Sequence, residues 1–117
     1  MSQTLIKNMN QEEVLNLAEQ VSVQKGQVVS KTIAQNKAVS ITIFAFDQDE
    51  EIGTHDSEGD AMVTVLEGTG KFTVDGTEYV VKQGETLIMP AKKPHSVYAN
   101  EAFKMLLVVV FPINDKQ

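Results

Sequence analysis

Two histidines are the residues of this chain whose type and placement suit chemistry. His55 lies in the stretch GTHDSEGD and His95 in the stretch PAKKPHSVY, and the 117-residue sequence has no other histidine and no cysteine. A neutral imidazole can bind a metal ion, exchange a proton near neutral pH or hydrogen-bond a ligand. The absence of cysteine excludes disulfides, thiolate metal sites and a cysteine nucleophile. If the strands that carry the two imidazoles pair, both side chains can face one cavity.

Other catalytic arrangements find little support in the sequence. Ser57 lies two residues after His55, but no third residue is placed to orient that base, so a catalytic triad is not predicted. The segment Gly68-Thr69-Gly70 lacks the lysine and the following helix of a phosphate-binding loop, and we predict a turn there. The acidic residues fall in expected loops, which disfavours the paired carboxylates of a glycosidase.

Length and composition limit the classes of function. A chain of 117 residues has the size of one domain, and an apolar content of 42% is enough for one core. Sixteen acidic and ten basic residues give a net charge of -6, which opposes binding to nucleic-acid phosphates. The longest apolar run, Met105 to Phe111, is too short to span a membrane, and the start MSQTLIKN lacks a signal-peptide pattern. We therefore expect a soluble cytoplasmic protein without nucleic-acid or membrane partners.

The N-terminal region predicts one short helix. Asn10 and Glu13 have the spacing of a capping box, which satisfies free N–H groups in the first turn of a helix. Apolar residues follow at helical spacing, namely Val14, Leu17, Ala18 and Val21. We predict an amphipathic helix from about Gln11 to Glu19 that covers a sheet.

The rest of the chain has the two-residue period of β-strands. Residues 39–46 alternate with apolar side chains on both faces, which indicates that both faces are covered. Asp75-Gly76-Thr77 is a hairpin signal because glycine tolerates positive φ, whereas the acidic run Asp47 to Glu51 predicts a solvated loop. Strands are expected at about 27–33, 39–46, 61–66, 71–74, 78–81, 86–89, 96–99 and 104–111. Many short strands between turns predict an all-β sandwich or barrel, in one domain over residues 1–117.

The alternation also predicts which side chains share a face with the histidines. Residues 55, 57 and 61 point to one side, while Asp56 and Asp60 point to the other. Mostly apolar residues of the later strands join the first side, and Val65 and Leu87 are among them. An apolar surface with a few polar groups is typical of a small-molecule site, although each apolar residue is also compatible with ordinary barrel core. The candidate pocket residues are His55, Ser57, Ala61, Val63, Met89, His95 and Val97.

The stretch around His55 resembles the first motif of the cupin superfamily. That motif contains a glycine and, after a spacer, His-x-His, three or four residues, a glutamate, six residues and a glycine. Leu66-Glu67-Gly68 matches the usual end of the strand and sets the register. In this register His55 stands at the first histidine, Ser57 at the second histidine and Ala61 at the glutamate.

The stretch around His95 resembles the second cupin motif. That motif contains a glycine, five residues, a proline, one residue, a glycine, two residues, a histidine, three residues and an asparagine. Gly84, Pro90 and His95 fit it at the right spacing, whereas Lys92 replaces the second glycine and Ala99 the asparagine. The two motifs span residues 53–99, and the strand pattern extends the likeness over about 27–111.

The resemblance implies a double-stranded β-helix, the jelly-roll barrel of small single-domain cupins, and decides barrel over sandwich. It also implies a homodimer, typically with a first strand lent to the partner. In the family, the two histidines of the first motif, its glutamate and the last histidine hold a divalent metal, and such donors suit iron, manganese, nickel, zinc or copper. This sequence keeps His55 and His95 of those four, which implies at most a weakly held Zn, Ni, Fe or Mn ion.

Three functions remain open at this point. The favoured one is binding of a small organic ligand in the barrel, with both imidazoles as hydrogen-bonding groups and without proven catalysis. The second is a metal-dependent enzyme of the dioxygenase or isomerase type, with His55 and His95 as ligands. The third is a structural or sensory module that acts through its dimer surface for a separate partner, since the chain contains no helix-turn-helix segment.

Overall fold

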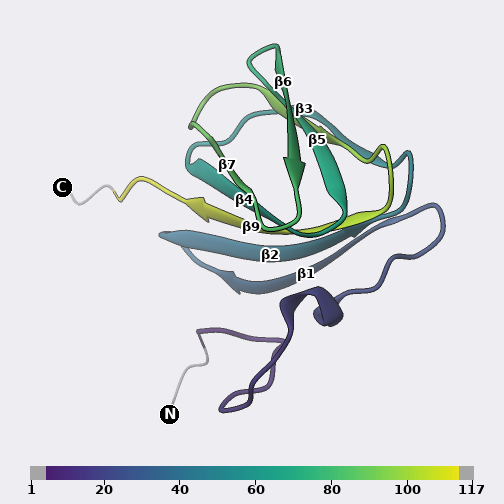
Figure 1. Ribbon diagram of the computed structural model, residues 1–117. Coiled ribbons are helices and arrows are strands. Elements are labelled where there is room, and N and C mark those ends of the chain that lie inside the picture. Colours follow the sequence, from purple (N-terminus) through teal and green to yellow (C-terminus); the bar gives the residue numbers. More distant parts are fainter. Residues whose placement is uncertain (1–4, 114–117) are drawn as a thin grey trace.

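The computed structural model describes residues 5–113, which fold into two facing antiparallel sheets (Figure 1). The five-stranded sheet has the order β1-β2-β9-β4-β7, and the four-stranded sheet has the order β3-β8-β5-β6. This arrangement confirms the predicted all-β jelly-roll barrel. The strands are β1 (Val28–Gln35), β2 (Val39–Phe46), β3 (Glu51–His55), β4 (Asp60–Glu67), β5 (Thr69–Val74), β6 (Thr77–Lys82), β7 (Thr86–Met89), β8 (His95–Tyr98) and β9 (Phe103–Val110).

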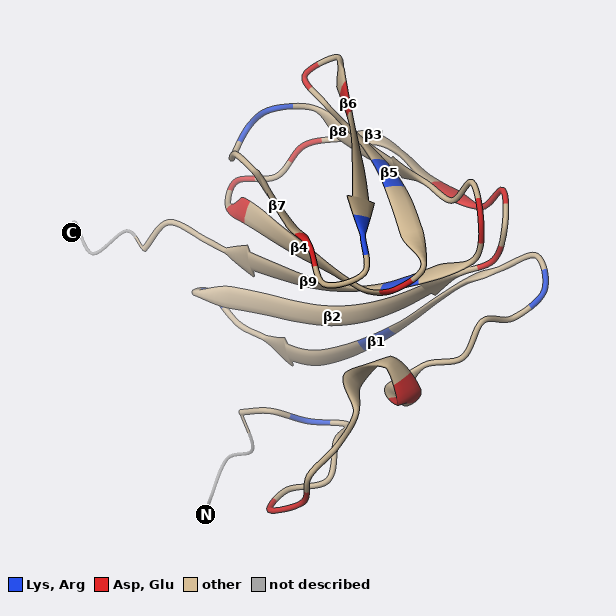
Figure 2. Ribbon diagram, viewed as in Figure 1, with Lys and Arg blue, Asp and Glu red and all other residues tan. Residues whose placement is uncertain are grey.

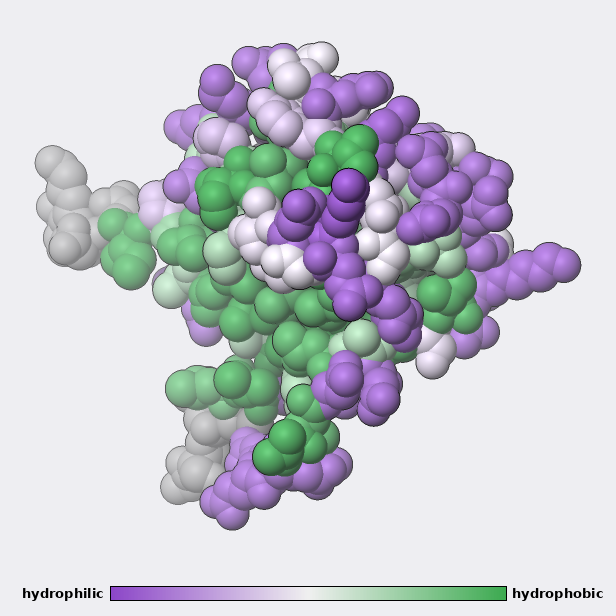
Figure 3. Space-filling model, viewed as in Figure 1, coloured by the Kyte–Doolittle hydropathy of each residue, from purple (hydrophilic) through white to green (hydrophobic). Residues whose placement is uncertain are grey.

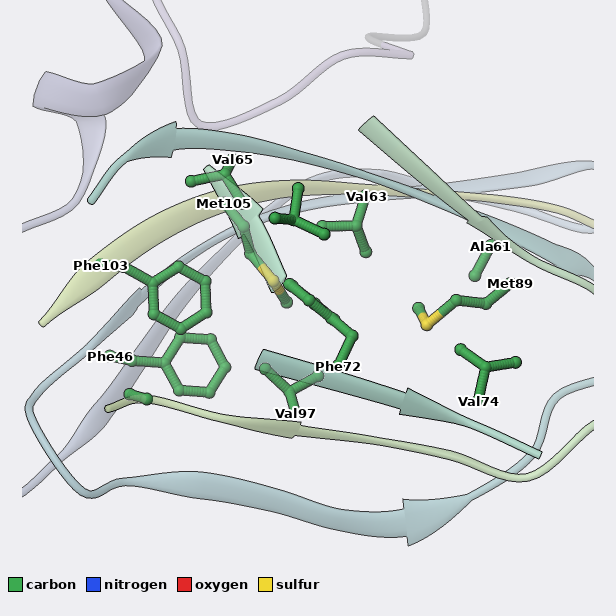
Figure 4. Close-up of a cluster of buried hydrophobic side chains, with 12 residues drawn as sticks. Phe46, Ala61, Val63, Val65, Phe72, Val74, Met89, Val97, Phe103 and Met105 are labelled. Carbon is green, nitrogen blue, oxygen red and sulfur yellow. The ribbon is translucent and has the colours of Figure 1, made fainter. Parts of the chain in front are cut away.

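Phenylalanines fill one end of the barrel interior (Figure 4). The rings of Phe46 and Phe103 stack with centroids 4.7 Å apart, and Phe72 meets Phe103 edge-on at 6.1 Å. All three side chains are buried. Gly70 is required beside them, because a Cβ at that position would lie 2.7 Å from the Phe103 ring. Aromatic pairs in these geometries stabilise a core beyond the area that they bury, so this end of the barrel is closely packed.

A second apolar layer lies on the outer face of the five-stranded sheet. Side chains of β1 and β2 point outward there and meet residues of the N-terminal segment. The buried members are Val21, Ile33, Ile43 and Ala45, and Met9 and Leu17 pack against them. Both faces of β2 are therefore covered, as its alternation predicts, because its phenylalanines point into the barrel.

The predicted α-helix over residues 11–19 is not formed. A single 3-10 turn, η1 (Leu17–Gln20), lies there instead. The side chain of Asn16 caps this turn by accepting a hydrogen bond from the Ala18 N–H at 3.0 Å. The Lys104 ammonium of β9 donates to the Ala18 carbonyl at 2.7 Å and fastens the turn to the sheet.

The helix prediction is wrong because it rests on local capping and spacing signals. A short helix also needs a surface on which its apolar face can pack. The side chains of Asn10 and Glu13 do hydrogen-bond each other at 3.3 Å, but Glu12 between them has a φ of +55°, outside the helical region. Val14 is 99% exposed, whereas Leu17 packs on the sheet. Short helices depend on tertiary packing of their apolar face, and here that face reaches the sheet over one turn only.

The strand β3 is an addition that the sequence pattern does not predict. It is an edge strand of the four-stranded sheet, and its residues are exposed except for partly buried Ile52. Because both faces of β3 are largely solvated, its sequence shows no apolar alternation. Glu51, which the acidic run predicts to lie in a loop, is the first residue of β3.

The hairpin between β5 and β6 has the predicted turn. Val74 pairs with Thr77, so Asp75 and Gly76 form a two-residue connection. Their φ angles are +50° and +87°. Two successive positive φ values define the type I′ turn, which fits the twist of the flanking strands and favours glycine.

Charged side chains lie mainly in the loops and at strand ends (Figure 2). Asp47 opens the acidic loop between β2 and β3, and its carboxylate accepts the N–H groups of Gly26 and Gln48 at 2.7 and 2.8 Å. These hydrogen bonds lower the pKa of the Asp47 carboxyl.

Within residues 5–113, no helix has the length and apolar character needed to cross a membrane.

Candidate functional site

A cavity of about 120 Å³ lies inside the barrel. Its walls are apolar apart from two imidazoles and one hydroxyl, and they consist of Phe44, Ile52, His55, Ser57, Ala61, Met89, His95, Val97, Met105, Leu107 and Val109. Figure 4 labels four of these residues: Ala61 and Met89 lie on the side away from Phe46 and Phe103, and Met105 and Val97 lie nearer to the rings. The cavity is therefore the unfilled end of the same interior.

Six of the seven candidate pocket residues line this cavity. They are His55, Ser57, Ala61, Met89, His95 and Val97. The seventh, Val63, is 0% exposed and belongs to the packed core between the sheets. Val65 is buried in the same core, and Leu87 packs against that core and also lines a groove beside β6. Strand alternation thus predicts which side chains face the barrel interior. It does not distinguish residues that line the cavity from residues of the packed core.

Strands β3 and β8 bring the two imidazoles together. His55 ends β3 and His95 begins β8, and the antiparallel register places them opposite each other. The register shifts between Ile52 and His55, so the pairing of β3 with β8 is irregular just before His55. The ring centroids lie 4.4 Å apart with an interplanar angle of 70°. The rings therefore meet edge to face at one end of the cavity.

The backbone fixes the tautomer of each neutral imidazole. His55 Nδ1 lies 2.9 Å from the Gly53 carbonyl oxygen, and His95 Nδ1 lies 3.1 Å from the Lys93 carbonyl oxygen. A carbonyl oxygen only accepts hydrogen bonds, so Nδ1 carries the hydrogen in both rings. Nε2 of each neutral ring then presents its lone pair. Neither Nε2 has a hydrogen-bond partner among the described residues.

Burial distinguishes the two rings. His95 is 4% exposed, whereas His55 is exposed to solvent. Burial lowers the pKa of His95, and the nearby His55 ring acts in the same direction, although the hydrogen bond to the Lys93 carbonyl opposes them. His95 is therefore held as a neutral imidazole, while His55 stands at the solvent side of the cavity.

Backbone contacts hold the loop between β3 and β4 against the cavity. Ser57 Oγ donates to the Gly59 carbonyl at 2.8 Å, and the Lys92 N–H donates to the Ser57 carbonyl at 2.8 Å. The Asp60 carboxylate accepts the Ala91 N–H at 2.8 Å. Asp60 thus ties two loops together and does not line the cavity, in agreement with its predicted orientation.

The sequence pattern does not predict five of the lining residues, namely Phe44, Ile52, Met105, Leu107 and Val109. Ile52 lies on the unpredicted strand β3. The residues of β9 belong to a run that is apolar on both faces, so its period does not identify the inner side. The alternation places Phe44 on a covered face of residues 39–46, and only the pairing of β2 with β9 shows that this face meets the cavity.

The donor set does not fit a resident transition metal. Catalytic zinc sites take three protein ligands, and the cavity offers two imidazole nitrogens, with the Ser57 hydroxyl and the Ala61 methyl group at the neighbouring positions. Among residues 5–113, no three or more His, Cys, Asp or Glu side chains are grouped so as to hold a metal ion. His55 and His95 alone therefore make a poor site for a permanently bound ion.

Comparisons with known proteins agree with this fold. The family model for the cupin domain matches residues 42–111, which is more than half of the chain. A comparison with curated proteins finds no match. The matched residues include both histidines and every cavity-lining residue.

Solved structures resemble the chain over nearly its whole length. A conserved protein of unknown function from Streptococcus pyogenes is 44% identical, with a TM-score of 0.94 and coverage of 97% of this chain and 99% of that one. A cupin superfamily protein from Desulfitobacterium hafniense is 30% identical, with a TM-score of 0.87 and coverage of 92% and 98%. A cupin 2 conserved barrel domain protein from Leptotrichia buccalis is 45% identical, with a TM-score of 0.81 and coverage of 82% and 47%. By its domain match, its barrel and these likenesses, the chain belongs to the cupin family.

Proposed function

We propose that this cupin binds a small organic molecule in the barrel cavity, with His55 and His95 as its hydrogen-bonding groups. One observation carries the proposal: an apolar cavity contains two imidazoles whose Nε2 lone pairs have no partner among the described residues. Among the described residues no fully buried side-chain nitrogen or oxygen lacks a hydrogen-bond partner, so each Nε2 is open to the cavity or to solvent. A ligand in the cavity can therefore reach these lone pairs and donate to them.

The size and lining of the cavity support an organic ligand. An apolar cavity of about 150 Å³ in another protein binds benzene, and this one measures about 120 Å³. It therefore suits a body of one ring or a short branched chain. The side chains of Met89 and Met105 are flexible and polarizable, so they can adapt to the shape of a ligand.

The same methionines offer a direct test. In protein labelled with ¹³C at the methionine methyl groups, a ligand in the cavity will shift the signals of Met89 and Met105. Met62 lies on the opposite face of β4 and is 38% exposed, so its signal is an internal control. A screen of ring-sized molecules should yield compounds that shift the two cavity signals and leave Met62 unchanged.

Two outcomes would contradict the proposal. Compounds that move only the Met62 signal bind outside the barrel. A diverse screen at millimolar concentration that leaves Met89 and Met105 unchanged would show that the cavity is a packing defect. A genuine ligand should also raise the melting temperature, because it binds the native state and not the unfolded chain.

The homodimer implied by the family resemblance is a further part of the proposal. A row of apolar side chains crosses the outer face of the five-stranded sheet, from Ile41 through Val108 and Met62 to Ile88. Ile88 is 53% exposed, and Figure 3 shows apolar side chains in the region of β7, β9 and β2. Solvated faces of antiparallel sheets are usually polar, so a second copy of the chain is the proposed cover. Ile88→Lys should halve the mass measured by light scattering, whereas a monomeric native protein would contradict the dimer.

A further inference from the structure

The polar side chains of the cavity share one property: each has used its donor on a backbone carbonyl and has an acceptor left for a ligand. His55 and His95 use their Nδ1 hydrogens on the carbonyls of Gly53 and Lys93, so Nε2 presents a lone pair. Ser57 uses its hydroxyl hydrogen on the Gly59 carbonyl, so its oxygen also presents lone pairs. Side chains on β3, β8 and the loop after β3 therefore offer acceptors to a ligand in the cavity, and these described side chains offer no donor.

Charged ligands match this surface poorly. An anion would face the lone pairs of neutral imidazoles, and no lysine or arginine is among the described residues that line the cavity. An ammonium group would lose its water shell inside an apolar cavity, which is costly without a paired charge, and no carboxylate lines the walls either. The matching partner is a neutral donor, of which the hydroxyl group is the simplest.

The walls favour an aromatic carrier for that hydroxyl. Phe44 can pack against a ligand ring edge to face or offset. Met89 and Met105 supply thioether sulfurs, which make favourable contacts with aromatic rings. A ring among these three side chains can turn a hydroxyl substituent toward the two imidazoles.

We propose that the cavity recognises a neutral phenolic ring, whose hydroxyl donates to Nε2 of His95 or His55. This inference rests on the proposed function, because it names the chemical class of ligand for the same cavity. The acceptor pattern carries it, and the apolar walls set the size. A phenol hydroxyl is un-ionised at pH 8, since the ordinary pKa of a phenol is about 10.

Four single-ring probes of similar shape test the donor requirement. Phenol, toluene, benzoate and benzylamine are titrated at pH 8 into protein with ¹³C-labelled methionine methyl groups, and dissociation constants are read from Met89 and Met105. Phenol should bind about fivefold more tightly than toluene, the gain expected of one net hydrogen bond. Benzoate and benzylamine should bind more weakly than toluene. Phenol should also shift the Nε2 resonance of at least one histidine, which toluene should leave in place.

Two variants connect the preference to the imidazoles. His55→Phe removes the acceptor at the exposed edge of the cavity, and His95→Phe removes the buried one. At least one of them should bring the phenol and toluene affinities together. Ser96→Ala is the matched control, because Ser96 follows His95 on β8 and its side chain points to the other face. This variant should keep the full preference, and His55→Phe remains informative if His95→Phe does not fold.

The outcomes separate this inference from the proposed function. Binding of toluene at least as tight as that of phenol, or tighter binding of benzoate or benzylamine, would overturn the phenol inference while the cavity remains a ligand site. A preference that persists unchanged in both histidine variants would overturn it as well. If none of the four probes moves the Met89 and Met105 signals at millimolar concentration, both the inference and the proposed function fail.

Discussion

The two ends of one barrel interior differ in what fills them. At one end Phe46, Phe72 and Phe103 pack ring against ring with almost no exposed surface. At the other end the small side chain of Ala61, between the same two sheets, borders a cavity of about 120 Å³. The backbone scaffold is shared, so side-chain volume decides which end is structural and which is open to a ligand. Substitutions that empty the packed end or fill the cavity end test this difference between the two ends.

The largest effect is expected from emptying the packed end. Phe72→Ala should destabilise the protein by about 3–5 kcal/mol, because it removes a fully buried ring and leaves a gap beside the Phe103 ring. Chemical denaturation with an unchanged slope against denaturant would measure this loss. A cost below about 1 kcal/mol would mean that the aromatic end can collapse around the gap, and the contrast between the two ends would weaken.

A smaller loss of stability is expected on acidification, and it arises from His95 at the cavity end of the barrel. Burial holds the pKa of His95 below its ordinary value of about 6.5, so the unfolded chain takes up the proton more readily than the folded one. The stability that His95 contributes is therefore fully present above pH 6.5 and is lost as the pH falls through 6.5 toward the folded pKa. The free energy of unfolding should drop between pH 7.5 and 5.5, and it should drop less in His95→Gln.

The variant Ser96→Ala supplies the control for this titration. It changes the neighbouring residue of β8 without removing a titratable group, so its pH profile should run parallel to that of the native protein. Parallel profiles for His95→Gln and the native protein would show that this imidazole does not couple to folding. Carboxylates titrate at lower pH, which keeps the upper part of the window specific for histidine.

The smallest effect on stability is expected from filling the open end. Ala61→Leu adds three carbons that the cavity can hold, so the free energy of unfolding should stay within about 1 kcal/mol of the native value. The same change should abolish the response of the Met89 and Met105 methyl signals to ligands. A destabilisation as large as that of Phe72→Ala would show that the cavity end is as tightly packed as the aromatic end.

The strands with one clearly buried face are the easiest to predict. β4 and β5 bury alternate residues against the barrel interior, and this periodicity is visible in the sequence. β2 is apolar on both faces, and its β-branched and aromatic residues still predict a strand. β3 was missed because an edge strand that is solvated on both faces has no such period. The N-terminal helix was predicted from a local capping pattern, but its formation depends on a packing surface that the sequence does not reveal.

The candidate site was also predictable only where the information lies close together in the sequence. His55 and His95 could be placed together from motif spacing, and their neighbours along each strand from alternation. Leu107 and Val109 could not, because their role depends on β9 lying between β2 and β4. Whether Val63 lines the cavity or fills the core depends on side-chain packing across the two sheets, which no one-dimensional pattern contains.

The central position of β9 has a consequence for how the protein is made. This strand follows all the others in the sequence, yet it pairs with both β2 and β4 at the centre of the five-stranded sheet. On the ribosome, β1 with β2 and β4 with β7 can form only as separate pairs until residues 103–110 have emerged. Such distant pairings close large loops and slow folding. The nascent chain thus carries two unfinished strand edges, and protection by a chaperone at this stage should raise the yield of the barrel.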